Sequence, residues 1–281
     1  MLSVESADGT LVVLAEEGEG PTILIVHGGM SDESPWGPVA GELAKDFRVV
    51  RIRRRLYRLE LSPDPATDFA REVDDLAAFT ATLNAPCLIV GHSSGAIVAL
   101  EALVAHPDAY AGAVLYEPPI VLDGPVGTPT SVARARAALA KNKVGTALRI
   151  FLKDCVRVPA ATAYMAGIFS GFMPDLKKYV ARQIEDMDAI DRLGRRVETY
   201  ATIQAPVLFL TGGKSPAHLG DRTRTLAGVM PHATITTMPE QGHGAQTADP
   251  ALVARLISEQ ARAVGLGEPS SDDDHQADVP G

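Results

Sequence analysis

A serine framed by two glycines is the most specific chemical pattern in the sequence. Gly91, Ser93 and Gly95 form G-x-S-x-G within "LIVGHSSGAIVAL", where an apolar run typical of a buried strand passes directly into a helical pattern. The turn is tight, so side chains at either glycine would collide with the strand and the helix. It lifts the serine hydroxyl out at one edge of a sheet and aims the first N–H groups of the helix at whatever the serine attacks. The pattern predicts a nucleophile at Ser93, with a purely structural Gly/Ser turn as the alternative.

A nucleophilic serine needs a base, and His243 is the best placed of the seven histidines. It lies in "MPEQGHG", a loop expected at the carboxyl end of the last strand and therefore at the same edge as Ser93. Glycines on both sides suit a loop that brings an imidazole close to another backbone. His92, beside the nucleophile, is expected to point the wrong way for proton transfer. The others lie at helix or strand ends or in the tail: His27, His106, His218, His232 and His275.

An oxyanion also needs donors, and "LIVHGGM" ends a strand at that edge. The backbone N–H of Gly29, together with that of Ser94 after the nucleophile, could form an oxyanion hole. Gly28 or Met30 could take the place of Gly29. His27 is expected to order this loop by hydrogen bonding and to have no chemical role.

Near-continuous apolar strands separated by helical patterns predict an α/β fold with a mostly parallel sheet covered on both faces. Residues 122–200 break this rhythm, because they contain helical patterns with no strand between them, which predicts a helical cap. The core would then comprise 1–121 and 201–265, followed by a disordered acidic tail, 266–281. The predicted strands lie within 10–18, 21–29, 47–53, 85–95, 110–119, 204–213 and 232–244, and the core helices within 71–85, 95–107, 215–230 and 249–264. Ser215 is the expected N-cap of the third of these helices, with Pro216 at its first position.

The segments "HGG", "GHSSGA" and "QGH" resemble the α/β-hydrolase superfamily over residues 10–120 and 201–264. The resemblance implies a catalytic triad whose members follow one another in the chain as serine, acid and histidine. It also implies an oxyanion hole formed by the strand–loop glycines and a helical cap inserted after the sixth strand of the family's sheet. One departure is visible. Many relatives carry a glycine-rich segment at a place where this chain has a basic one, formed by Arg53, Arg54, Arg55, Tyr57 and Arg58. This basic segment is expected either to contact the substrate or to form a solvated loop.

The triad acid is not where the family usually has it. The loop "TGGKSP" after the strand at 204–213 holds no carboxylate, and a cation such as Lys214 could not orient an imidazolium. Glu117 follows the preceding strand at the same edge, with two prolines fixing the chain after it. Some α/β-hydrolases place their acid there, including haloalkane dehalogenases and the lactone hydrolases that open the zearalenone ring, which look similar at "SSGA". We therefore predict Glu117 as the acid, with Asp221 as the main rival and Asp123 further away.

These residues predict a serine hydrolase that cleaves an ester or lactone of an apolar small molecule, without cofactor or metal. An apolar pocket is expected from aromatic and methionine side chains, each of which could instead be ordinary core: Trp36, Met165, Phe169 and Phe172. A cofactor-free perhydrolase or haloperoxidase-like enzyme, a lyase with the same triad, and a non-catalytic small-molecule binder are the alternatives. A dehalogenase or epoxide hydrolase is disfavoured, because both use an aspartate where Ser93 stands.

The composition and charge of the chain limit the classes of partner that it is expected to bind. The formal net charge is −9 over 281 residues, and five of those negative charges lie in the acidic tail, which leaves −4 for the rest. This mild charge gives no reason to expect nucleic acid or an anionic membrane as partner. No run of 18 apolar residues and no signal peptide is evident, and Cys87 and Cys155 are expected to be buried, reduced thiols. A cytoplasmic location is expected, with a homodimer left open.

Overall fold

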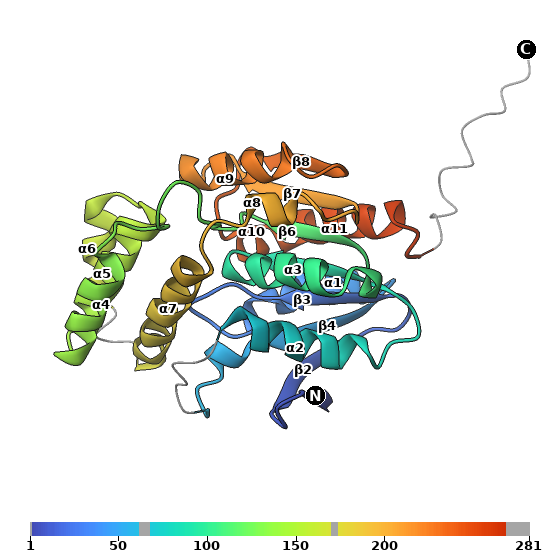
Figure 1. Cartoon of the computed structure of the whole chain (residues 1–281), viewed down its shortest axis with the longest axis horizontal. Coiled ribbons are helices and arrows are strands. Elements are labelled where there is room, and N and C mark those ends of the chain that lie inside the picture. Colours follow the sequence, from blue (N-terminus) through green and yellow to red (C-terminus); the bar gives the residue numbers. More distant parts are fainter. Residues whose placement is uncertain (1, 62–67, 170–173, 268–281) are drawn as a thin grey trace, which may run out of the picture.

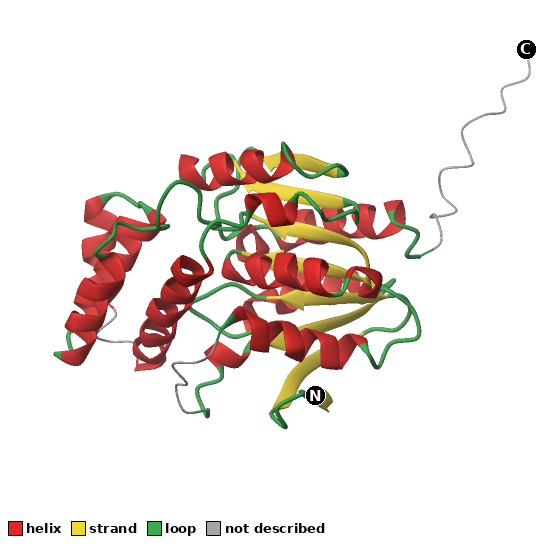
Figure 2. Cartoon of the chain, viewed as in Figure 1, coloured by secondary structure: helices red, strands yellow, loops and turns green. Residues whose placement is uncertain are grey.

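The computed structural model describes residues 2–61, 68–169 and 174–267, and within them eight strands form one sheet (Figures 1 and 2). The strand order is β1-β2-β4-β3-β5-β6-β7-β8, with β1 and β2 antiparallel to their neighbours and all other pairs parallel. The strands are β1 (Leu2–Glu5), β2 (Leu11–Glu17), β3 (Thr22–Val26), β4 (Arg48–Arg53), β5 (Cys87–His92), β6 (Tyr110–Tyr116), β7 (Val207–Gly212) and β8 (Ala233–Met238). The predicted fold class is therefore confirmed.

Burial explains which strands the sequence pattern revealed. Every residue of β5 is buried, and β3, β6 and β7 are nearly so, because helices cover both faces of a parallel sheet. The edge strand β1 was not predicted, since its four residues are too few for their alternation to be distinctive.

Helices on the two faces of the sheet create two separate cores. One core packs α2 (Phe69–Thr80), α3 (Ser94–Ala105) and α9 (Ala217–Ala227) against the sheet, and the other packs α1 (Gly37–Leu43) and α11 (Pro250–Ala263). Shorter elements complete the layers: α8 (Val197–Tyr200), α10 (Ala245–Ala248), and 3₁₀ turns at Ser34–Trp36, Arg55–Tyr57 and Pro107–Ala109. No helix among the described residues is both long and apolar enough to cross a membrane.

The chain between β6 and β7 builds a helical layer beyond one edge of the sheet (left in Figure 1). Its small core is formed by apolar side chains from α4, α5 and α7. The elements are α4 (Ser131–Ala140), α5 (Val144–Ile150), a π-helical turn (Phe151–Val156), α6 (Ala160–Phe169) and α7 (Pro174–Leu193). The predicted cap, 122–200, contains these helices; its assignment as a domain stays a prediction. The predicted tail lies almost wholly outside the described residues.

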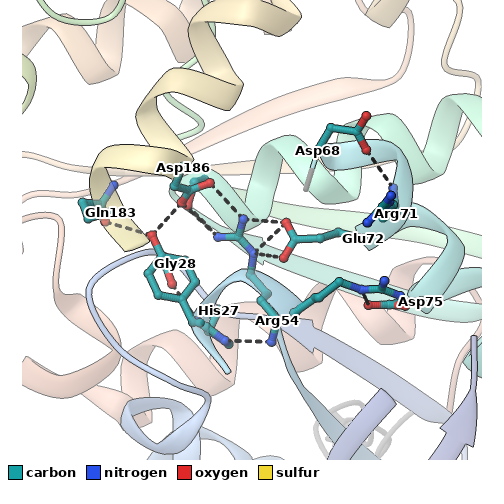
Figure 3. A network of polar contacts seen from close by, with 12 residues as sticks. His27, Gly28, Arg54, Asp68, Arg71, Glu72, Asp75, Gln183 and Asp186 are labelled. Atoms are coloured by element: carbon teal, nitrogen blue, oxygen red, sulfur yellow. Dashed lines mark hydrogen bonds and ion pairs between the residues drawn. The ribbon is translucent and has the colours of Figure 1, made fainter. Parts of the chain in front are cut away.

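The basic segment after β4 is largely buried, so the expectation of a solvated loop is wrong. A contact from this segment to the substrate stays a prediction. Arg54, Arg55 and Arg58 are buried, because carboxylates from other elements pair with the first two. The Arg54 guanidinium, 1% exposed, bonds Glu72 of α2 (Nη2–Oε2 2.7 Å) and Asp186 of α7 (Nη2–Oδ1 3.1 Å). Figure 3 shows this network between the two helices.

All five N–H groups of Arg54 have an acceptor. Nε donates to Glu72, Nη2 donates to Glu72 and Asp186, and Nη1 donates to Ser94 Oγ at 2.7 Å and to Asp186 Oδ2 at 3.3 Å. Tyr57 adds a bond from its hydroxyl to Asp186 Oδ2 at 2.7 Å. A buried charge is tolerated only when it is paired and hydrogen-bonded in this way. The network therefore ties α7 of the helical layer to the sheet.

We expect Arg54→Met to lower the free energy of unfolding by about 3–5 kcal/mol, because it leaves two buried carboxylates without their cation. The exposed ion pair between Arg255 and Glu259 supplies the control: Arg255→Met should cost no more than about 0.5 kcal/mol. Urea unfolding of the two variants and the parent chain measures both values. A loss below about 1 kcal/mol for Arg54→Met would contradict a structural role for the network.

Candidate active site

The turn at Ser93 has the strained geometry that the motif requires. Ser93 has φ 52° and ψ −126°, and it precedes α3 without forming a side-chain capping bond. Its N–H donates to Tyr116 O at 2.9 Å, which anchors the turn to β6. A Cβ at Gly91 would lie 2.5 Å from Ala96 Cα, and one at Gly95 would lie 2.2 Å from His27 O. Only glycine fits either place, so the sequence pattern follows from this packing.

The structure places Glu117 and His243 in direct contact. Glu117 Oε2 lies 2.5 Å from His243 Nδ1, and the carboxylate is fully buried at the end of β6. The same oxygen accepts from the Ser215 hydroxyl at 2.9 Å, and Oε1 accepts from Gly212 N–H at 2.8 Å. Because the carboxylate can only accept, Nδ1 of the imidazole carries the proton and Nε2 is left as the basic nitrogen.

Two aromatic side chains hold the loop that carries His243. The Tyr116 hydroxyl donates to Gly242 O, and His92 Nε2 lies 2.9 Å from His243 O. The His92 ring stacks on Tyr116 with centroids 5.0 Å apart. Burial, with His243 nearby, holds the pKa of His92 well below its usual value, so the ring is neutral and donates through Nε2–H. His92 therefore holds the loop that carries His243.

The predicted oxyanion loop lies beside Ser93. A Cβ at Gly28 would lie 3.0 Å from Ser93 Cβ, and Met30 adopts φ 63°. His27 Nε2 accepts from Arg54 N–H at 3.1 Å, and its Nδ1 lies 2.6 Å from Gly28 O. Burial lowers the pKa of His27 to about 4, so it stays neutral and orders the loop.

The alternative acids lie away from the imidazole. Asp221 is exposed and pairs with Arg224 at 2.5 Å, and Asp123 is exposed. Lys214 pairs with Glu240 on the surface. The expectation that Ser215 caps the next helix is wrong: α9 begins at Ala217, after an extended Pro216, and the Ser215 hydroxyl donates to Glu117 instead.

A cavity of about 240 Å³ brings the predicted site residues together. Gly29, Ser93, Ser94 and His243 all line it. The rest of its lining is mostly apolar and comes largely from the helical layer, including the π-helical turn: Met30, His92, Pro119, Val126, Phe151, Leu152, Cys155, Val156, Gln183, Met187, Ile190, His218 and Leu219. The described residues contain no cluster of His, Cys, Asp and Glu that could hold a metal ion.

The pocket predicted from large side chains differs from this one. Trp36 is 1% exposed and does not line the cavity, because it packs against His92 in the core on the face covered by α1 and α11. Met165 is 47% exposed on the outside of α6 and is not part of the lining. The Phe169 side chain and all of Phe172 lie outside the described residues. Sequence reasoning missed Gln183 and the π-helical turn, since no local pattern marks them.

Comparison with known proteins gives a consistent result. A model of the alpha/beta hydrolase family matches residues 23–256. A 2-(acetamidomethylene)succinate hydrolase of Mesorhizobium japonicum is 23% identical over 260 residues, which cover 86% of this chain and 88% of that protein.

Solved structures agree with this family over almost the whole chain. An α/β hydrolase from Sphaerobacter thermophilus superposes with a TM-score of 0.79 and 28% identity, covering 92% of this chain and 99% of its own. An esterase from Rhodococcus sp. ECU1013 superposes with a TM-score of 0.69 and is 23% identical, covering 95% of this chain and 99% of its own. At this identity the similarity supports the fold alone. The family match spans the nucleophile turn, Glu117 and His243, and the chain therefore belongs to the alpha/beta hydrolase family.

Proposed function

We propose that the protein is a serine hydrolase that cleaves an ester or lactone bond of an apolar small molecule through an acyl-enzyme on Ser93. One observation carries the proposal: Ser93 and His243 line a single cavity, and the imidazole is bonded at 2.5 Å to the buried carboxylate of Glu117. Nucleophile, base and orienting acid are the parts that acyl transfer needs.

Each proton has a defined place in the proposed mechanism. His243 Nε2 accepts the proton of the Ser93 hydroxyl as its oxygen attacks the carbonyl carbon. Glu117 holds the Nδ1–H and stabilises the imidazolium that forms. The tetrahedral oxyanion would be bound by the backbone N–H groups of Gly29 and Ser94, both at the cavity wall. Ser94 is the first residue of α3, where N–H groups have no partner within the helix.

The second half of the reaction uses the same groups. The imidazolium gives its proton to the leaving alkoxide, and the imidazole then takes a proton from water. The oxygen of that water attacks the acyl carbon, and the imidazolium returns its proton to Ser93 Oγ as the acid leaves. No cofactor enters either step. The cavity favours a small acyl group, because 240 Å³ lies below the usual range of about 300–1,000 Å³ for ligand sites.

We expect Ser93→Ala to lower kcat on a simple 4-nitrophenyl ester by roughly 10⁵–10⁶-fold, because the attacking oxygen is lost. Circular dichroism should show an intact fold, since alanine fits the same place. Labelling of the parent chain by a fluorophosphonate, and its absence in the variant, would place the covalent bond on this residue. Turnover in the variant equal to that of the parent chain would end this proposal, and a parent chain that binds esters without turnover would be a binder.

We expect Glu117→Gln to lower kcat by about 10³–10⁴-fold, because the amide keeps the shape but loses the charge that sets the histidine tautomer. The matched control is Asp221→Asn, on an exposed carboxylate, which should change kcat by less than about 3-fold. Steady-state rates of both variants on one ester test the assignment. The reverse pattern would make Asp221 the acid, and small losses in both would exclude a triad.

A further variant uses the neighbour of the acid. Ser215 already donates to Glu117 Oε2, so an acid at this position lies on the same side of His243. We expect Ser215→Asp to recover part of the kcat lost in Glu117→Gln. In the parent background the same change should lower kcat, because two carboxylates would then share one imidazole.

A further inference from the structure

Both proposed oxyanion donors are backbone N–H groups that have no acceptor within the described part of the chain. The N–H of Gly29 lies in the loop after β3, and that of Ser94 begins α3, where helix geometry supplies no partner. Both residues line the cavity that Ser93 and His243 also line. An oxyanion hole is effective only when its donors are held in place before the reaction, so the groups that fix these two donors affect the rate.

The Gly29 N–H belongs to the same peptide group as the Gly28 carbonyl, and a buried histidine bonds that carbonyl. Nε2 of His27 accepts from the Arg54 N–H at 3.1 Å, a bond that Figure 3 shows. Nδ1 of the ring therefore carries the proton and donates to Gly28 O at 2.6 Å. No described peptide bond is cis, and in a trans peptide the carbonyl and the N–H point in opposite directions. The bond from His27 consequently fixes the direction of the Gly29 N–H.

The residue that carries the second donor is bonded by the side chain of the same arginine. Arg54 Nη1 donates to Ser94 Oγ at 2.7 Å, and Glu72 and Asp186 hold the guanidinium in turn. Hydrogen bonds from a charged donor are shorter and about twice as strong as neutral ones. Arg54 thus reaches both sides of the hole. Its main chain acts on the Gly29 peptide through one imidazole, and its side chain acts on Ser94 directly.

We infer that Arg54 and His27 are positioning residues for the oxyanion hole, and that they fix the Gly29 and Ser94 donors relative to each other. The inference rests on the proposed function, because the hole is used only if Ser93 forms a tetrahedral intermediate. Both positioning residues are buried, and neither lines the cavity. They therefore act on the transition state, in which charge develops on the carbonyl oxygen, and not on binding of the uncharged ester.

Two replacements of His27 separate the hydrogen bond from the packing of the ring. In His27→Phe a ring stays in place without a donor to Gly28, and we expect kcat on a 4-nitrophenyl ester to fall by roughly 10²-fold, with KM changed by less than about 3-fold. Asparagine places an amide N–H close to the position of Nδ1, so His27→Asn should keep kcat within about 5-fold of the parent chain. The exposed His232→Phe is the matched control and should change neither constant.

The side-chain bond from Arg54 to Ser94 is tested without breaking the buried ion pairs. Ser94→Ala removes Oγ and keeps the backbone N–H, and we expect kcat to fall by about 10-fold with KM nearly unchanged. The affinity of a trifluoromethyl ketone, which forms a charged adduct with Ser93 in the hole, should fall by the same factor as kcat in each variant. A variant that merely folded less well would lose active protein and leave this affinity unchanged.

Labelling by a fluorophosphonate separates the two proposals, because it builds negative charge at the hole without turnover of a carboxylic ester. If the parent chain is labelled but hydrolyses no ester, the proposed function fails, and labelling of His27→Phe that is slower by roughly 10²-fold still supports the inference.

Nuclear magnetic resonance of the parent chain gives a measurement that needs no variant. The shifts of the ring nitrogens should show His27 protonated at Nδ1 alone. A ring protonated at Nε2 would overturn the inference. So would His27→Phe and Ser94→Ala variants that keep both the kcat and the ketone affinity of the parent chain.

Discussion

The buried carboxylate of Glu117 sets the arrangement of the whole catalytic edge. A fully buried carboxylate is stable only when donors surround it, and here three donors share its two oxygens. They are the N–H of Gly212, the hydroxyl of Ser215 and the Nδ1–H of His243, all from the last third of the chain. The loops after β7 and β8 therefore take their shape from this one group. The loop after β7, which holds no carboxylate of its own, donates two of these hydrogen bonds to Glu117, the proposed acid.

Residues with strained backbone conformations cluster at the same edge of the sheet. Five described non-glycine residues have φ between 47° and 64°, and three of them are Met30 in the oxyanion loop, Ser93 and Glu117. Each such conformation costs on the order of 1–3 kcal/mol and persists only where its surroundings fix it. Ser93 N–H is held by Tyr116 O, and Glu117 N–H by Leu210 O at 3.2 Å. The central parallel strands thus provide the rigidity that keeps the nucleophile and the acid in strained positions.

Local features of the sequence predicted the parts of the site that depend on local geometry. The turn at Ser93 could be recognised because the glycines and the strand-to-helix change lie within a few residues. Glu117 could be chosen because its strand ends at the edge where Ser93 lies. The burial of Arg54 could not be foreseen, since its partner Asp186 lies 132 residues later and a run of arginines on its own looks solvated. The prediction of the cavity lining was wrong for the same reason. Trp36 and Met165 have the apolar character expected of a pocket, but only the packing of the helical layer decides which side chains face Ser93.

The Arg54 network also decides which wall of the cavity can move. Ser94 belongs to it through Oγ and to the proposed oxyanion hole through its backbone, while Asp186 and Gln183 are neighbours on α7. One cation here serves two buried carboxylates, and burial raises the pKa of Glu72. Lifting α7 would separate Asp186 from Arg54 and leave a buried charge unpaired, at a cost of several kcal/mol. Among the described residues, the π-helical turn has no such buried ion pair to the sheet, and its Val156 O accepts from His218 at 3.0 Å. The wall that α7 forms is consequently fixed to the sheet, and side chains that position a substrate need such rigidity.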